Sequence, residues 1–165
     1  MQTFLVSPSF AETAHCLDKK RLGKQRVEAK QILNALHGKS KGWVNHPATL
    51  MWYGYEDALS FYHDCMVAEW INRGYKNNMP FLYTRTDRSD AGTCQLRKLS
   101  LPHPEYPHWW RDENTLKKII VSHQSNLKRK DPTYYNYEFL SDDLPYFWPV
   151  TKAEVEAKRV LALCP

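Results

Sequence analysis

Apolar side chains recur at helical spacing along the first quarter of the chain. The stretch begins at Ser9, which has Glu12 three residues later in the arrangement of a capping box. It ends at His37-Gly38, a common stop signal for helices. The apolar stripe between these ends consists of Leu22, Ala29, Ile32, Leu33 and Leu36. The pattern predicts one long helix over residues 9–36.

Three further helices follow from the same spacing and from their boundary residues. The second covers residues 47–73 and opens with a proline, which suits a first helical turn. The third covers residues 114–130 and ends before Pro132. A short last helix, residues 151–163, opens with the capping-box sequence TKAE. We expect a mainly α protein: a compact bundle of three long helices with long irregular loops, plus a short C-terminal helix.

Composition places the chain among folded proteins and excludes several classes. Hydrophobic residues make up 42% and charged residues 25% of the 165 positions, which argues against wholesale disorder. No apolar run approaches the roughly 18 residues of a membrane span, and the first residues do not resemble a secretory signal. The four cysteines are widely spaced, as is typical of reduced thiols. We therefore expect a cytoplasmic protein that does not bind membranes.

No motif indicates a metal or a nucleotide cofactor. The seven histidines include no H-x-x-x-H or H-E-x-x-H spacing. Walker, G-x-G-x-x-G and G-x-S-x-G patterns are also missing from the sequence. We expect no metal site and no cofactor.

The positive charge of the chain is concentrated near its start. The net charge is +5, and residues 1–41 carry eight Lys and Arg side chains against three acidic ones. The whole surplus therefore falls in the first quarter of the sequence. A block of this kind is typical of a surface that binds a polyanion such as nucleic acid, and equally of a solvated basic helix face.

Four polar side chains share one edge of the first predicted helix. At 100° per residue they fall within an arc of roughly 80° beside the apolar stripe. These residues are Asp18, Arg21, Gln25 and Glu28. They could form a structural network, because buried polar groups need partners. They could instead line a pocket, with Glu28 or Asp18 as the acid or base and Arg21 as an anion clamp.

Polar residues at two other helices are further candidates. His46 precedes the second helix, where it could contact a phosphate or carry a proton; the alternative is simple capping by Asn45. His123, Asn126 and Lys130 form an i, i+3, i+7 stripe on the third helix that could meet DNA. Surface helices often carry such a stripe without binding anything.

Clustered aromatic residues could stack on exposed bases. The paired indoles Trp109-Trp110 and the cluster Tyr134-Tyr135-x-Tyr137 have the flat faces that such stacking needs. Aromatic side chains are more often part of a core. Beside a basic N-terminal helix, the clusters favour nucleic acid as the partner.

Three stretches of the chain together resemble the pyrimidine-dimer DNA glycosylases of the endonuclease V type. The first, residues 15–27, is a basic helix after a short N-terminal segment, and the second, residues 51–75, ends in Arg-Gly-Tyr. The third, residues 122–137, runs from Ser-His-x-x-Asn-Leu to the tyrosine cluster. The resemblance implies a glycosylase-like helical domain over residues 1–140. Residues 141–165 are then a C-terminal extension packing on it, which the compact viral members lack.

The resemblance also implies a mechanism. Members thread the N-terminus between helices and attack C1′ of a damaged nucleotide with the N-terminal α-amine, forming an imine. Here the amine is that of Met1, because residue 2 is too large for removal of the methionine. The family's catalytic glutamate aligns with Leu22 or Gly23, neither of which is acidic. We therefore assign the role of catalytic carboxylate to Glu28, with Asp18 as the second candidate. We add Gln25, which shares their edge of the helix, to the catalytic candidates.

These inferences predict a DNA repair-type glycosylase, with or without AP-lyase activity, that excises a damaged or modified pyrimidine flipped from the duplex. The expected partner is double-stranded DNA with a damaged or modified base, bound by a monomer. The candidate DNA-binding residues are Arg21, Lys24, Arg26, His46, Asn126, Lys130 and Tyr134. The alternatives are a glycosylase for a hypermodified base and a non-catalytic binder of distorted DNA.

Overall fold

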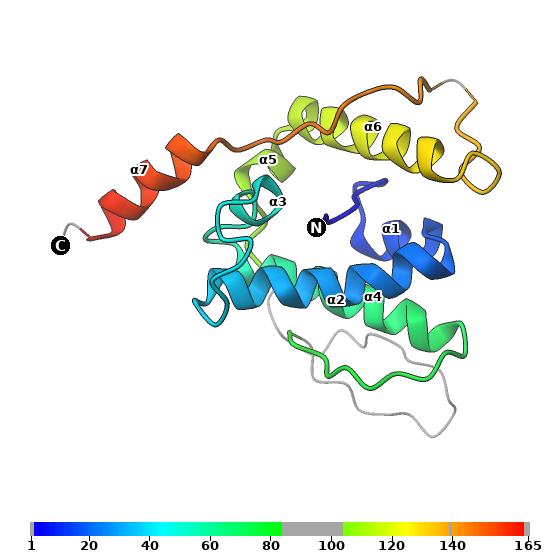
Figure 1. The fold of residues 1–165 in the computed structure, drawn as a ribbon, viewed down its shortest axis with the longest axis horizontal. Helices are drawn as coiled ribbons and strands as arrows, with labels where there is room; N and C mark the ends of the chain where they lie inside the picture. The colour runs from blue at the N-terminus through cyan, green and yellow to red at the C-terminus, as the bar shows by residue number, and fades with distance from the viewer. Residues whose placement is uncertain (1, 84–103, 139, 164–165) are drawn as a thin grey trace.

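The protein is mainly α. The computed structural model describes residues 2–83, 104–138 and 140–163, and within these ranges it contains helices and no strand (Figure 1). The helices are α1 (Phe10–Cys16), α2 (Lys19–Leu36), α3 (Pro47–Leu50), α4 (Glu56–Asn72), α5 (His108–Arg111), α6 (Glu113–Lys130) and α7 (Lys152–Leu163). Of these helices, none is long and apolar enough to span a membrane. The expectation of a mainly α fold is confirmed.

The N-terminal segment, residues 2–6, lies buried between the three longest helices (Figure 1). Phe4 N–H donates to Gln25 Oε1 of α2 at 2.9 Å, and Leu5 N–H donates to His123 Nδ1 of α6 at 3.0 Å. Tyr62 of α4 donates its hydroxyl to the Phe4 carbonyl at 2.9 Å. An extended segment without sheet partners needs such side chains, because buried backbone polar groups must be paired. The threaded N-terminus that the family resemblance implies is present.

The predicted helix over residues 9–36 is wrong as a single element, because it breaks at Leu17. Leu17 has extended backbone, and Asp18 caps α2 by accepting from the backbone N–H groups of Lys20 and Arg21 at 2.8 and 3.1 Å. The guanidinium of Arg73 donates to the carbonyl of Leu17 at 2.7 Å and to two further carbonyls at the end of α1. The break is therefore stabilised by a residue distant in sequence, which local spacing does not reveal.

The predicted second helix also divides. Gly54 has a φ of +80°, a conformation that favours glycine, and it separates α3 from α4. At the start of α3 the cap is His46 rather than Asn45, since His46 Nδ1 accepts from the Ala48 N–H at 3.1 Å. The long helix over residues 47–73 is therefore wrong as a single element, and so is capping by Asn45.

The third and last predicted helices are confirmed. Helix α6 begins one residue before the predicted start and ends at the predicted residue. The capping box before α7 is formed, with Thr151 N–H donating to Glu154 Oε2 at 2.6 Å. Between them the chain returns along α6 (Figure 1), where Ser125 accepts from Leu144 N–H at 3.1 Å and Ser122 accepts from Phe147 N–H at 3.2 Å.

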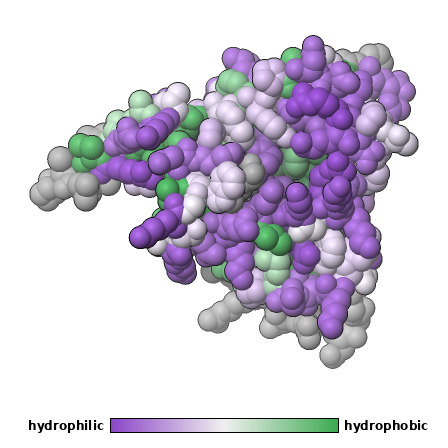
Figure 2. All heavy atoms as spheres, in the orientation of Figure 1, coloured by the Kyte–Doolittle hydropathy of each residue, from purple (hydrophilic) through white to green (hydrophobic). Residues whose placement is uncertain are grey.

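Most aromatic side chains lie in the core or pack against it. Trp109 is fully buried and donates its indole N–H to the Met51 carbonyl at 2.9 Å. Trp110 packs edge-on against Phe10, which lies in the same aromatic cluster. The paired indoles are therefore core residues, not a stacking surface. Outside the core, hydrophilic side chains cover most of the face seen in Figure 2, with apolar side chains in small patches.

Candidate DNA-binding pocket

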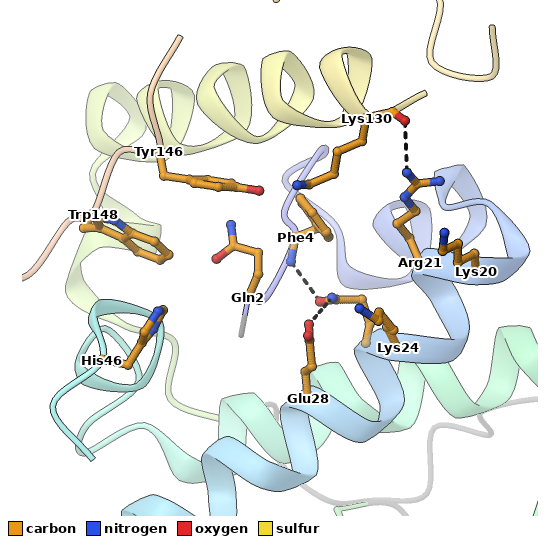
Figure 3. A pocket seen from close by; sticks show the side chains of 11 residues that line it. Gln2, Phe4, Lys20, Arg21, Lys24, Glu28, His46, Lys130, Tyr146 and Trp148 are labelled. Carbon is orange, nitrogen blue, oxygen red and sulfur yellow. Dashed lines mark hydrogen bonds between the residues drawn. The ribbon is translucent and has the colours of Figure 1, made fainter. Parts of the chain in front are cut away.

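A pocket of about 520 Å³ opens beside α2, within the usual size range of small-molecule sites. The N-terminal segment, α2, the start of α3, the end of α6 and residues 146–148 all contribute to it (Figure 3). The lining residues are Gln2, Phe4, Lys20, Arg21, Lys24, Gln25, Glu28, His46, Lys130, Tyr146 and Trp148. Six of the predicted site residues thus come together here: Arg21, Lys24, Gln25, Glu28, His46 and Lys130.

One side of the pocket is positively charged. We call Lys20, Arg21, Lys24 and Lys130 the cationic wall. Arg21 is held in place, since it donates to Asp18 Oδ2 at 3.2 Å and to the Lys130 carbonyl at 3.3 Å. The lysines of the wall are exposed. Arg21 is paired with Asp18 and also with Asp131 at 3.4 Å, so three exposed lysines supply the free positive charge of the wall. Three lysines against one lining carboxylate suit a phosphate-bearing ligand.

That carboxylate, Glu28, is positioned by Gln25. The Gln25 side chain is buried, and its Oε1 accepts from Phe4 N–H at 2.9 Å and lies 2.7 Å from the Tyr62 hydroxyl, whose one proton is shared between this oxygen and the Phe4 carbonyl. A backbone N–H can only donate, so the orientation of the amide is settled. Its NH₂ group therefore donates to Glu28 Oε2, 3.0 Å away. Burial, and then the charge of Glu28, raise the pKa of Tyr62 well above its usual value, so the hydroxyl remains a donor.

Gln2 is fixed on the opposite side by His123. Burial lowers the pKa of His123 to about 3, so the imidazole is neutral at pH 7. Because Leu5 N–H donates to Nδ1, the neutral ring carries its proton on Nε2, which lies 2.9 Å from the Gln2 amide. Met1 itself lies outside the described residues. Its Cα is nevertheless about 3.8 Å from that of Gln2, by covalent geometry.

The third side of the pocket is aromatic. We call His46, Tyr146 and Trp148 the aromatic wall. The rings of Tyr146 and Trp148 are 5.6 Å apart, and those of His46 and Trp148 are 5.9 Å apart. Burial, and then the positive charge of the chain terminus, lower the pKa of His46, so this ring also stays neutral at pH 7. In Figure 3 the aromatic wall faces the α2 cations, with Gln2 and Glu28 between them.

Two other predicted residues of α2 and its cap serve the fold. Both oxygens of Asp18 are engaged, by the helix cap and by the Tyr135 hydroxyl at 2.5 Å. Burial raises the pKa of Asp18, but the hydrogen bonds from Tyr135 and from Arg21 N–H outweigh it and lower the pKa overall. Arg26 lies away from the pocket, with its guanidinium 3.9 Å from the Trp70 ring centre. Neither residue lines the pocket.

The polar stripe of α6 faces the interior. His123 and Asn126 are fully buried, and Asn126 donates to the Leu144 carbonyl at 3.0 Å. Only Lys130 of the stripe reaches the pocket. Tyr134 is 51% exposed, but it borders a separate groove on the other side of α2.

Sequence reasoning missed five of the lining residues: Gln2, Phe4, Lys20, Tyr146 and Trp148. Tyr146 and Trp148 alternate around Phe147 between two prolines. Such a segment is extended and turns residues i and i+2 to the same side. The same alternation brings Gln2 and Phe4 to the pocket. The alternation of side chains along an extended segment could therefore have identified Gln2, Phe4, Tyr146 and Trp148 from the sequence.

The described residues contain no group of three or more His, Cys, Asp or Glu side chains that could hold a metal ion. The lining of the pocket offers a carboxylate, amides, cations, the imidazole of His46 and aromatic faces.

Comparison with known proteins gives one match. A family model described as pyrimidine dimer DNA glycosylase matches residues 1–83, just over half of the chain. No curated protein matches the chain, and no solved structure matches it. The matched region includes Gln2, Glu28 and His46. Lys130, Tyr146 and Trp148 lie after it in the sequence. A DNA glycosylase family implies DNA as the partner, which agrees with the cationic wall. The chain belongs to the pyrimidine dimer DNA glycosylase family.

Proposed function

We propose that this protein removes a damaged or modified pyrimidine from double-stranded DNA by attack of the Met1 α-amine at C1′ of the target sugar. The observation that carries the proposal is the position of Glu28. It is the one carboxylate among the lining residues of a pocket that also contains Gln2 and the cationic wall. The proposed acting form is a monomer.

The α-amine is a suitable nucleophile near neutral pH. Its ordinary pKa of about 7.7–8.0 leaves a useful fraction unprotonated, whereas an exposed lysine with a pKa of about 10.4 is almost wholly protonated. The nitrogen bonds to C1′ while the glycosidic bond breaks, and the electron pair of that bond leaves with the base, which takes up a proton. The nitrogen then gives one proton to Glu28, and the C1′–O4′ bond opens as that proton passes to O4′, which leaves the protonated imine.

Glu28 has two roles in this scheme. Its negative charge stabilises the positive charge that develops at C1′, and it accepts the proton that the amine releases. Gln25 is a positioning residue, since its amide ties Glu28 to Phe4 N–H of the N-terminal segment. One side chain thus fixes the distance between the carboxylate and the chain end that carries the amine.

The cationic wall binds the phosphates on either side of the target sugar. Lys20 and Lys24 extend from α2, and Lys130 approaches from the end of α6 (Figure 3). Imine formation at C1′ also permits the AP-lyase step, in which Glu28, once its proton has passed to O4′, removes a proton from C2′, a C2′–C3′ double bond forms, and the C3′–O bond breaks with its electron pair leaving on the 3′ phosphate. We include this step in the proposal because it needs no group beyond those already named.

Borohydride trapping on duplex DNA with one abasic site tests the proposal. We expect a covalent adduct with the unmodified protein, and mass spectrometry should locate it on the first residue. Acetylating the N-terminus, or extending it by a few residues, should abolish the adduct while binding to abasic DNA persists.

Other outcomes identify the alternatives. An adduct that survives a blocked N-terminus and disappears in Lys24→Gln or Lys130→Gln would overturn the assignment to Met1. Base release without an adduct would indicate a glycosylase without the imine step. Neither base release nor an adduct would leave a non-catalytic binder of distorted DNA.

A further inference from the structure

We infer that the pocket holds the target base itself, outside the duplex: a single pyrimidine stacked on the aromatic wall, with the Gln2 amide donating to a ring carbonyl oxygen. This inference rests on the proposed function and specifies which part of the substrate enters the pocket. It also assigns base recognition to the segment around residues 146–148, which the match to the family does not include.

The order of groups across the pocket supports this placement. The cationic wall lies on one side, Glu28 and Gln2 lie in the middle, and the aromatic wall lies on the other side (Figure 3). A nucleotide with its phosphates on the cations and its C1′ beside Glu28 has its base directed away from the cations. The base then meets the rings of Tyr146 and Trp148.

Gln2 has an unpaired end in this space. The residue is only 7% exposed, and one of the two polar ends of its amide has no hydrogen-bond partner. The other end faces His123 Nε2, which carries the ring proton and therefore donates. Only the amide oxygen can accept this proton, so we assign the oxygen to the end that faces His123 and exchange it with the nitrogen, which makes the NH₂ group the unpaired end. A buried donor without an acceptor is costly, and a ligand acceptor would satisfy it.

The aromatic wall offers faces for stacking next to that donor. Tyr146 and Trp148 are only partly buried, and their rings are inclined by 32° to each other. Both belong to the extended segment that Ser122 and Ser125 hold along α6. The carbonyl oxygens of a pyrimidine accept hydrogen bonds from an amide NH₂, and its ring stacks on an indole. Enzymes that act on a base read it outside the stack by this combination of contacts.

The test compares affinities for two kinds of non-cleavable duplex at one salt concentration. One kind carries a mispaired 2′-fluoro nucleotide with thymine, uracil or cytosine; the other carries a tetrahydrofuran abasic analogue at the same position. We expect the unmodified protein to prefer at least one base-bearing duplex by roughly tenfold, as for one stacked base. Trp148→Ala should remove this preference and leave the affinity for the abasic duplex unchanged, and Trp148→Phe should restore much of it.

Gln2→Glu isolates the hydrogen bond. A carboxylate still accepts from His123 Nε2 but cannot donate to a carbonyl oxygen. We expect the ratio of the affinity for the base-bearing duplex to the affinity for the abasic duplex to fall about fivefold. The added negative charge weakens both affinities, so the ratio corrects for it. Tyr134→Ala is the matched control, because Tyr134 is 51% exposed and borders the groove on the other side of α2, not the pocket. The preference should survive this change.

A ratio near one for all three bases, or a preference that Trp148→Ala leaves intact, would overturn the inference. Unchanged affinity of Trp148→Ala for the abasic duplex shows that the variant is folded. The outcome is separate from borohydride trapping. A trapped adduct without any base preference would support the proposed imine chemistry and contradict the base-binding site. A base preference without an adduct would support the site and contradict the imine chemistry.

Discussion

Helix α2 separates two depressions in the surface, and Lys20, Lys24 and Glu28 border both. On one side is the pocket, where one end of the Gln2 amide, assigned above as the NH₂ group, has no partner and the lysines are exposed. On the other side is a broader groove of about 920 Å³, bordered by Arg26, Trp70 and Tyr134 among others.

Two charged residues that border only the groove, Asp18 and Arg26, are engaged by other parts of the fold. Arg26 lies over Trp70 and donates to Asn77 Oδ1 at 2.9 Å, and Asp18 is bound by Tyr135 and Arg21. Residues of similar type therefore serve binding on one side of the helix and folding on the other. The partners of each charged residue, rather than the total charge of the helix, distinguish the two sides: Asp18 and Arg26 are bound by Tyr135 and Trp70, whereas Glu28 is held at the pocket by Gln25.

The largest difference between the two sides should appear in matched amide substitutions of their carboxylates. Glu28→Gln removes the charge beside C1′, so we expect base release to slow by about 100-fold or more with an unchanged melting temperature. Asp18→Asn weakens the Arg21 and Tyr135 contacts, and we expect it to cost about 1–2 kcal/mol of stability with little change in rate. Single-turnover kinetics and thermal unfolding measure the two effects. The reverse pattern would move the chemistry to the cap of α2.

The next effect concerns salt. Replacing Lys20, Lys24 and Lys130 by Gln should reduce the slope of log affinity against log salt by about 0.9 for each phosphate that the protein no longer neutralises. Arg26→Gln is the matched change on the groove side and should leave the slope unchanged, because its guanidinium is engaged by Trp70 and Asn77. Titrations at several salt concentrations decide between them. A reduced slope in Arg26→Gln would place DNA over the groove.

The two sides of α2 also show what local patterns can predict. The arc of Arg21, Gln25 and Glu28 follows from helical periodicity alone, and the structure does bring these side chains to one pocket. The end of α6 and the start of α7 were also predictable, because Pro132 follows the first and a capping box precedes the second in the sequence. Periodicity could not separate the binding side of α2 from the structural side, since Asp18 and Arg26 find their partners at Tyr135 and Trp70.

The features of the fold and the site that local patterns do not predict depend on contacts between distant parts of the chain. The break at Leu17 is stabilised by Arg73, which lies 56 positions away. Gln2 meets His123, 121 positions away. The aromatic wall forms because serines of α6 hold the returning segment. None of these contacts leaves a local signal, although the alternation around Phe147 does indicate which side chains share a face.

Lowering the pH should reduce the free energy of unfolding through His123, the residue that holds Gln2 at the pocket. The pKa of His123 falls from its ordinary value of about 6.5 to about 3 on folding. The unfolded chain therefore binds a proton between these values that the folded chain does not, and stability falls with decreasing pH in this window by up to about 1.4 kcal/mol per pH unit. Above pH 6.5 the residue contributes no pH dependence. Denaturant unfolding from pH 7 to 4 measures the slope, and His123→Gln should flatten it. An equal slope in that variant would assign the titration to another group.

The smallest effect should come from Tyr134. Its ring is half exposed and packs edge-on against Tyr135, with a centroid distance of 4.9 Å. It borders the groove and not the pocket, so we expect Tyr134→Ala to change the affinity for abasic DNA by no more than about 0.5 kcal/mol, or roughly twofold, as for an ordinary surface residue. A base stacked on this ring would instead contribute about 1–3 kcal/mol. Fluorescence anisotropy with a labelled duplex resolves the two cases, and Trp148→Ala with a base-bearing duplex provides the reference for removal of a stacking partner. A loss above fivefold in Tyr134→Ala would extend the DNA interface across α2 and end the distinction between its two sides.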